Sequence, residues 1–230
     1  NFLSHSFIHR YRKSISLIKI TKGKKILDLG CGTGVLIPYI LENKLQYYGI
    51  DNSNDMLNFI KKKYHKHFDS IKLIYDNFDE YDYSDNIDVY FGIGFIEYFE
   101  KPFKRIDTLI DNLNDDGQII LSFPNKISLD NLMLKLFFIP KKIIKFIFNI
   151  STNQPPRTMF TFRDVNRYVK SKKNIKIKYK FYNTNIFVYP FTKFFPTFSN
   201  YMGNLFEDSF LNKFSFFSSG FIVLFEKKIK

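Results

Sequence analysis

The chain has 230 residues and a formal net charge of +13, from 35 lysines and arginines against 22 acidic residues. This length suits a single α/β domain, and no uncharged apolar run reaches the roughly eighteen residues that a membrane span needs. The single cysteine, Cys31, excludes an internal disulfide and fits a reducing compartment such as the cytoplasm. No secretory signal is evident, and the sequence starts at Asn1 instead of methionine, as a fragment or a processed form would.

The positive charge has two interpretations. A net charge of +13 attracts polyanions, which favours a nucleic acid or an anionic membrane as partner. The lysines, however, are spread over all segments of a chain that is also rich in Asn, Ile, Phe and Tyr, which indicates a general compositional bias. No RNA-recognition or OB pattern is visible. Composition alone therefore gives nucleic acid binding only weak support.

The first predicted element is a helix within residues 2–20. Its apolar positions recur at helical spacing and include Tyr11, with basic residues such as Arg12 between them. Residues 1–22 are expected either to cover a ligand site as a lid or to pack on the sheet.

A glycine-rich turn follows the first predicted strand, at residues 25–29. The sequence Asp28-Leu29-Gly30-Cys31-Gly32-Thr33-Gly34 spaces its glycines as G-x-G-x-G, whereas dinucleotide sites use G-x-G-x-x-G. Glycines let bare backbone approach a ligand. The carboxylate of Asp28 would repel a pyrophosphate, but it suits an ammonium group and a ligand with a cationic sulfonium. The turn thus predicts a site for S-adenosylmethionine.

The second predicted strand, residues 46–50, leads to Asp51, which lies about twenty residues beyond the first glycine. A carboxylate at the carboxyl end of such a strand faces the ligand crevice of an open α/β sheet and can hold both hydroxyls of a ribose. A helix capped by Ser53 or Asn52 is expected next, through Lys63.

Further strands are expected at residues 71–75, 87–91, 118–123, 175–182 and 220–226. The turn signal Asp115-Asp116-Gly117 precedes the strand at residues 118–123. The alternation of the strands with helical segments predicts a Rossmann-like, doubly wound, mostly parallel sheet of seven strands, with helices on both faces. The histidines His65 and His67 lie among lysines with no carboxylate or cysteine at ligand spacing, so no metal site is expected.

Five features follow one another along the chain: the glycine-rich turn, the strand ending in Asp51, and the blocks at residues 76–78, 87–99 and 113–125. In the sequence and order of these features the chain resembles the class I S-adenosylmethionine-dependent methyltransferase superfamily, of the small-molecule type. The resemblance is best over residues 24–125. The resemblance implies S-adenosylmethionine as cofactor and S-adenosylhomocysteine as product. It assigns to the cofactor Asp28, Gly30, Cys31, Gly32 and Gly34 (methionine), Asp51 and Asn52 (ribose), Met56, Asp76, Asn77 and Phe78 (adenine), and Gly92 and Ile93 (backbone beneath it). It also implies that Tyr11 or Arg12 reaches the methionine carboxylate, and that the last strand of the sheet is antiparallel.

Glu97 and Tyr98 are the candidate catalytic residues. Many relatives read Leu-Glu-His where this chain has Ile96-Glu97-Tyr98, so a histidine base is excluded at this point. With an ordinary pKa near 10, tyrosine is a poor base at neutral pH, although its hydroxyl could orient an acceptor. Glu97 could take a proton from an oxygen acceptor; alternatively, it caps the following helix or pairs with Lys101.

Substrate choice is expected to lie outside the cofactor-binding core, residues 23–125. A lid insertion is expected at residues 126–160, with two amphipathic helices that close an apolar acceptor pocket or lie on an anionic membrane. Residues 161–230 are expected to close the sheet and to carry an aromatic-rich insertion at residues 189–219, which forms a cap, a subunit contact or an acceptor pocket. Arg157, before a helix at residues 161–170, is the candidate partner for an anionic substrate group.

Together these features predict a cytoplasmic enzyme, with peripheral contact at the inner membrane face as an option. It would transfer a methyl group from S-adenosylmethionine to a small-molecule or glycan- or lipid-linked acceptor, at oxygen. Two alternatives remain at this point. One is an RNA methyltransferase, supported by the charge, and the other is a non-catalytic protein-binding subunit that keeps the fold, supported by the aromatic carboxyl-terminal region.

Overall fold

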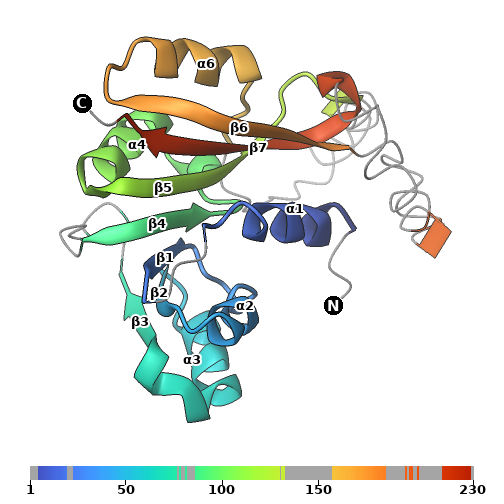
Figure 1. The fold of residues 1–230 in the computed structure, drawn as a ribbon. Helices are drawn as coiled ribbons and strands as arrows, with labels where there is room; N and C mark the ends of the chain where they lie inside the picture. Colours follow the sequence, from blue (N-terminus) through green and yellow to red (C-terminus); the bar gives the residue numbers. More distant parts are fainter. Residues whose placement is uncertain are drawn as a thin grey trace.

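A computed structural model of the chain contains one mixed sheet, and its seven strands lie within the described residues in the order β3-β2-β1-β4-β5-β7-β6 (Figure 1). The structure describes residues 5–19, 23–76, 78, 81, 86–129, 131–132, 157–184, 195, 197–198, 201 and 214–228. The strands are β1 (Lys25–Leu29), β2 (Gln46–Asp51), β3 (Ile71–Tyr75), β4 (Ile87–Gly92), β5 (Leu113–Pro124), β6 (Ile175–Thr184) and β7 (Ser218–Lys227). The helices are α1 (His5–Ile15), α2 (Ile37–Glu42), α3 (Asn54–Lys63), α4 (Pro102–Asp111) and α6 (Phe162–Lys170), with short 3-10 helices η1 (His65–Ser70), η2 (Ile96–Tyr98) and η4 (Ser215–Phe217).

Strand directions follow the predicted doubly wound pattern. Strand β1 pairs in parallel with β2 and β4, β2 with β3, and β4 with β5. Strand β7 runs antiparallel to both of its neighbours, β5 and β6. The carboxyl ends of β1, β2 and β4 therefore meet at one edge of the sheet, where ligands bind in folds of this kind.

Helices cover both faces of the sheet (Figure 1). Alternate strand residues point to opposite faces, so Leu27 and Tyr90 face α4 and α6, whereas Ile26 and Phe91 face α1, α2 and α3. These four side chains are 0 % exposed. Two hydrophobic layers thus sandwich the sheet and fix the strand ends that carry the site.

The fifth strand begins earlier than the sequence predicts. The structure starts β5 at Leu113 and not at residue 118, because the turn signal lies inside the strand. Ile87 pairs with Leu113 and Val89 already pairs with Gln118, so the intervening residues bulge out of the ladder. A Cβ at Gly117 would lie 2.6 Å from the side chain of Leu113, which shows how tightly the bulge folds back.

Local capping explains two helix starts. The hydroxyl of Ser53 accepts a hydrogen bond from the backbone N–H of Met56, which confirms Ser53 as the cap of α3. Helix α6 begins with a capping box: Thr161 accepts from the N–H of Asp164, and the carboxylate of Asp164 accepts from the N–H of Thr161. These hydrogen bonds also hold the Asp164 pKa below its ordinary value.

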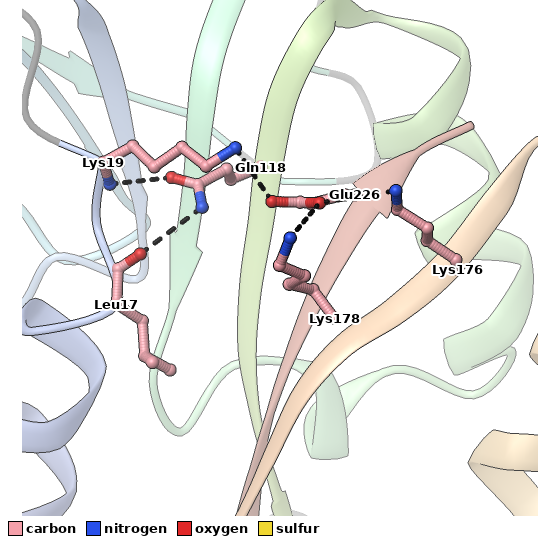
Figure 2. Close-up of polar contacts among 6 residues, drawn as sticks. All are labelled: Leu17, Lys19, Gln118, Lys176, Lys178 and Glu226. Atoms are coloured by element: carbon pink, nitrogen blue, oxygen red, sulfur yellow. Dashed lines mark hydrogen bonds and ion pairs between the residues drawn. The ribbon is translucent and has the colours of Figure 1, made fainter. Parts of the chain in front are cut away.

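The segment after α1 is fastened to the far strands (Figure 2). The side chain of Gln118, on β5, accepts a hydrogen bond from the backbone N–H of Lys19 and donates one to the carbonyl of Leu17. The ammonium of Lys19 lies 3.0 Å from the carboxylate of Glu226, on β7, which Lys176 and Lys178 also approach. Helix α1 is therefore held against the sheet at its carboxyl-terminal side.

Several predicted features lie outside the described residues: most of the two amphipathic helices at residues 126–160, most of the aromatic-rich insertion, and Asn77. Within the part of the chain that the structure describes, no helix is both long and apolar enough to cross a bilayer.

Candidate active site

A cavity of about 1000 Å³ opens at the carboxyl ends of β1, β2 and β4. Its lining residues are Gly30, Asp51, Asn52, Phe78, Tyr81, Gly94, Phe95, Tyr98, Phe99, Glu100, Lys101, Lys104, Arg105 and Thr108. Five of the residues predicted to contact the cofactor or the acceptor are therefore in this wall: Gly30, Asp51, Asn52, Phe78 and Tyr98.

The glycine-rich turn leaves β1 with a sharply bent backbone. Gly30, Gly32 and Gly34 all have positive φ, between 51° and 69°, a conformation that favours glycine. The N–H groups of Gly30 and Cys31 donate to the carbonyl of Ile50, which ties the turn to β2.

Gly32 and Gly34 serve different purposes. A Cβ at Gly32 would meet nothing within 4 Å, so the backbone there borders open space. A Cβ at Gly34 would lie 2.6 Å from Ile37 and 3.1 Å from Ile60, so this glycine lets the turn pack on α2 and α3. The backbone of the turn is thus exposed at Gly32, whereas Gly34 packs in the core.

Asp51 joins the turn to the start of α3. One carboxylate oxygen accepts a hydrogen bond of 2.8 Å from the N–H of Gly32, and the other accepts one of 2.9 Å from the N–H of Ser53. The residue is 8 % exposed and lines the cavity. Each carboxylate oxygen can accept more than one hydrogen bond, so Asp51 can still accept from ligand hydroxyls.

Asp28 is buried in β1, below the turn. Its Oδ2 accepts a hydrogen bond of 2.9 Å from the hydroxyl of Tyr47, and its Oδ1 has no hydrogen-bond partner among the described residues. Burial raises the pKa of Asp28 to about 7; the Tyr47 bond acts against this rise, and the charge of Asp51 adds to it. A buried acceptor atom without a donor is costly. This site therefore fits a ligand that brings a cationic donor, such as the ammonium of S-adenosylmethionine.

An aromatic wall forms another side of the cavity. The ring centroid of Phe95 lies 4.9 Å from that of Phe78 and 4.8 Å from that of Phe99, both in edge-on arrangements. Tyr81 lines the same wall. Such a wall can take a flat base by stacking. Phe78 was predicted for this role; Phe95, Phe99 and Tyr81 were not, and sequence offers no signal that separates them from ordinary core aromatics.

Met56, Asp76, Gly92 and Ile93 were assigned to the cofactor but are not among the residues that line this cavity. Met56 is 41 % exposed on α3, and Asp76 donates its backbone N–H to the carbonyl of Asp51. Gly92 and Ile93 are buried, and the cavity wall after β4 is formed instead by Gly94 and Phe95. Gly94 has a positive φ of 77° and donates its N–H to the hydroxyl of Ser122.

Cys31 and Tyr11 belong to the hydrophobic layer beneath the turn. Cys31 is 1 % exposed, and its pKa is raised by burial. Tyr11, from α1, is 5 % exposed, and its ring centroid lies 5.6 Å from that of Phe91. Burial raises the pKa of the Tyr11 hydroxyl, and Asp28 adds to this effect. Helix α1 therefore packs on the sheet, and a contact of Tyr11 with the cofactor stays a prediction.

Glu97, Tyr98 and Arg157 form a polar cluster after β4. Glu97 is 3 % exposed; its Oε1 lies 3.9 Å from Nη2 of Arg157, and its Oε2 has no hydrogen-bond partner among the described residues. Burial raises the pKa of Glu97, while Arg157 and Arg10 act in the opposite direction. The hydroxyl of Tyr98 accepts two hydrogen bonds from Arg157.

Both alternatives considered for Glu97 from sequence were wrong. Helix α4 begins after Lys101 with no side-chain cap, and the ion pair of Glu97 in the described structure is with Arg157. The carbonyl of Glu97 also accepts a hydrogen bond of 2.8 Å from the N–H of Thr158. This backbone contact brings the segment at residues 157–160 to η2, a long-range pairing that local sequence does not reveal.

The glycine-rich turn, Asp51 and the aromatic wall thus border one cavity, and the buried carboxylate of Glu97 lies beside Tyr98, which lines it. The expected superfamily agrees with comparisons to known proteins. A profile described as "Methyltransferase domain" matches residues 20–185. The chain is 31 % identical over 134 residues to a carboxy-S-adenosyl-L-methionine synthase from Campylobacter lari, and the aligned part covers 56 % of this chain and 54 % of the relative. The chain therefore spans about half the length of the curated relatives it matches.

Solved structures share the fold. An S-adenosylmethionine-dependent methyltransferase from Mesorhizobium loti matches with a TM-score of 0.64 and 15 % identity over 96 % of this chain and 98 % of its own. The magnesium protoporphyrin IX methyltransferase of Synechocystis, solved with bound S-adenosylhomocysteine, matches with a TM-score of 0.59 and 14 % identity over 97 % and 81 % of the two chains. The predicted Rossmann-like fold is confirmed.

Proposed function

The chain belongs to the methyltransferase domain family, within the class I S-adenosylmethionine-dependent superfamily, and from this premise we propose that it methylates an oxygen of a small-molecule or glycan- or lipid-linked acceptor. The observation that carries the proposal is Glu97. This carboxylate is 3 % exposed, its Oε2 has no hydrogen-bond partner in the described structure, and its pKa is raised. An acceptor hydroxyl suits this buried oxygen, because the hydroxyl can donate a hydrogen bond to Oε2 and can transfer its proton to it.

Cofactor binding is assigned to residues at the strand ends. Asp28 would meet the ammonium group, the bare backbone around Gly32 would lie along the methionine part, and Asp51 would accept from the ribose. The adenine would lie between Asn52 and the aromatic wall, where it would contact Phe78 and Phe95. When bound, S-adenosylmethionine supplies a methyl group already activated by its positive sulfur.

The remaining task of the chain is to position the acceptor. An acceptor oxygen must lie in line with the methyl group at about 3 Å, and holding it there removes much of the entropic part of the barrier. Glu97 would accept the hydroxyl proton through Oε2. Tyr98, which lines the cavity and is 45 % exposed, would orient the acceptor. Arg157 would hold an anionic group of the acceptor, because its side chain is 57 % exposed.

Calorimetric titration with S-adenosylmethionine and S-adenosylhomocysteine is the first test, on the wild-type protein and on Asp51→Ala. Binding by the wild type that is lost in the variant supports the site. A screen of hydroxylated acceptors, followed by mass spectrometry, then tests the reaction, and Glu97→Gln should lower product formation without weakening S-adenosylhomocysteine binding. Failure of well-folded wild type to bind either ligand would leave a scaffold role.

A second candidate is supported by the two curated relatives, both described as carboxy-S-adenosyl-L-methionine synthase and both 31 % identical to this chain over the matched part. In that case a carboxyl group from a carboxylate-bearing second substrate would replace a hydrogen of the bound S-adenosylmethionine, and Arg157 would hold that carboxylate. Mass spectrometry separates the two: a methylated acceptor supports methyl transfer, whereas a cofactor heavier by the mass of CO2 supports the second candidate.

A further inference from the structure

Tyr47 reaches across from β2 to Asp28 on β1. The two strands are parallel neighbours, and Asp28 pairs in register with Gly49. A Cβ on Gly49 would lie 2.7 Å from the ring of Tyr47 and 3.0 Å from its hydroxyl. The missing side chain at Gly49 therefore leaves the space through which the tyrosine reaches the carboxylate. Both partners are fully enclosed, with exposures of 1 % for each residue.

The hydrogen bond fixes which carboxylate oxygen remains available. Tyr47 donates to Oδ2, so Oδ1 is left without a hydrogen-bond partner in the described structure. Among the described residues, the titratable groups that interact with Asp28 are Tyr47 on β2, Asp51 at the end of β2, Cys31 in the turn and Tyr11 on α1. All four are acids, so none of them supplies a positive charge to the carboxylate.

We propose that Tyr47 is a positioning residue that aims Oδ1 of Asp28 at the ammonium group of the cofactor, and that cofactor binding releases a proton from Asp28. The inference rests on the proposed function only in taking S-adenosylmethionine and its product as ligands. Tyr47 lies outside the predicted site, and the glycine-rich motif does not imply that cofactor binding depends on pH.

The coupling follows from the charge states. Without ligand, burial raises the pKa of Asp28 to about 7, so near neutral pH a large fraction of the protein carries the proton. An ammonium group beside the carboxylate favours the charged form, so binding drives the proton off. The bond from Tyr47 favours the same charged form. Removal of the Tyr47 hydrogen bond should therefore raise the pH that is needed for tight binding.

The test is calorimetric titration with S-adenosylhomocysteine, which carries the ammonium group but has no methyl to transfer. Titrations in buffers of different ionisation enthalpy, at several pH values around neutrality, give the number of protons released. For the wild type we expect release near neutral pH that disappears as the pH rises well above Asp28's pKa. Asp28→Asn should release none.

Tyr47→Phe should bind about tenfold more weakly at neutral pH, the effect of one hydrogen bond to a charged group. Its affinity should recover as the pH rises, and its proton release should persist to higher pH. Tyr90→Phe is the matched control: Tyr90 is also a fully buried strand tyrosine, but its hydroxyl donates to the carbonyl of Asn112, far from the turn. This variant should keep the wild-type pH profile.

The outcomes separate the inference from the proposed function. If wild type does not bind S-adenosylhomocysteine, the proposed function fails. If it binds with no proton release, or if Tyr47→Phe keeps the wild-type pH profile, only this inference is overturned. Should Tyr47→Phe not fold, the side-chain carbon NMR signal of Asp28 in ligand-free wild type decides: titration near pH 7 supports the inference, and titration below about pH 5, near the ordinary aspartate value, overturns it.

Discussion

The guanidinium of Arg157 donates two hydrogen bonds to the hydroxyl of Tyr98, over 3.0 Å from Nε and 2.6 Å from Nη2. The same guanidinium lies over the Tyr98 ring, 5.1 Å from its centroid. The two residues are 59 positions apart, and the contact joins the segment before α6 to the loop after β4. It places an exposed cation beside the cavity and next to the buried Glu97.

Tyr98→Phe tests whether this contact serves the acceptor or the fold. The variant removes the acceptor of both hydrogen bonds, but the pair is largely exposed, so the free energy of unfolding should fall by less than about 1 kcal/mol. KM for an acceptor identified by screening should rise, while affinity for S-adenosylhomocysteine stays unchanged. Steady-state kinetics and calorimetry measure the two effects. Equal losses in both would instead assign Tyr98 to the cofactor site.

The two glycines of the turn should respond differently to alanine. Gly34→Ala adds a Cβ that clashes with Ile37 at 2.6 Å on top of an unfavourable φ of 69°, so unfolding free energy should fall by about 2 to 5 kcal/mol. Gly32→Ala meets open space and should lose only about 1 kcal/mol, from its φ alone. Thermal unfolding measures both.

Binding provides the second readout for this pair. The methyl group in Gly32→Ala projects where a ligand is expected, so the folded variant should bind S-adenosylhomocysteine much more weakly than wild type. Unchanged binding by Gly32→Ala would contradict the placement of the ligand along the turn.

Asp51→Asn tests the link between the turn and α3. The carboxylate accepts from the N–H groups of Gly32 and Ser53, and an amide cannot reproduce both acceptors. Affinity for S-adenosylhomocysteine should fall about 10- to 100-fold, as expected for hydrogen bonds to a charged group. Asp88→Asn is the control, because Asp88 also accepts two hydrogen bonds but interacts with Lys25 and Asn114 at the opposite end of the sheet. A similar loss of affinity in both variants would show a general effect on the fold.

Local patterns were enough to predict the strands and the glycine-rich turn. Alternation of apolar runs with helical segments located each of the seven strands, and the spacing of Gly30, Gly32 and Gly34 identified the loop that borders the cavity. A cap of α3 by Ser53 or Asn52 was also predicted, because a cap depends on neighbours three residues away, and the structure shows Ser53 in this role. The start of β5 was wrong because a bulge and a turn have the same local chemistry.

The polar cluster of Glu97, Tyr98 and Arg157 could be predicted only in part. Glu97 and Arg157 were named separately, but their contact depends on a backbone hydrogen bond between Thr158 and Glu97 that only the fold creates. Tyr47 was recognised only as part of a strand, because its bond to Asp28 requires the register between β1 and β2. Residue type and spacing carry no record of such pairings.

Gln118→Leu tests the anchor of α1 shown in Figure 2. The variant keeps the bulk of a fully buried side chain but leaves the N–H of Lys19 and the carbonyl of Leu17 without their partner. Both hydrogen bonds are only partly buried, so the loss of each should cost about 1 kcal/mol. Amide hydrogen exchange at residues 10–19 should accelerate, while exchange in β1 stays slow. Unchanged exchange there would show that packing alone holds α1.

Asp28 should make the stability of the ligand-free protein depend on pH. Its folded-state pKa, about 7, is higher than the ordinary aspartate value near 3.9. The protonated form is therefore favoured by folding, and this contribution is fully present below about pH 3.9 and is lost as the pH rises through 7. Chemical denaturation of wild type and Asp28→Asn between these values isolates the effect, because other groups titrate equally in both.

The stability of wild type relative to Asp28→Asn should fall by up to about 4 kcal/mol over that range, at about 1.4 kcal/mol for each unit of pKa difference. Saturating S-adenosylhomocysteine should remove the trend in wild type, since the ammonium group stabilises the carboxylate at neutral pH. A relative stability that stays constant with pH in the ligand-free protein would mean that Asp28 is already charged without ligand. Its second oxygen would then be satisfied by water rather than held ready for the cofactor.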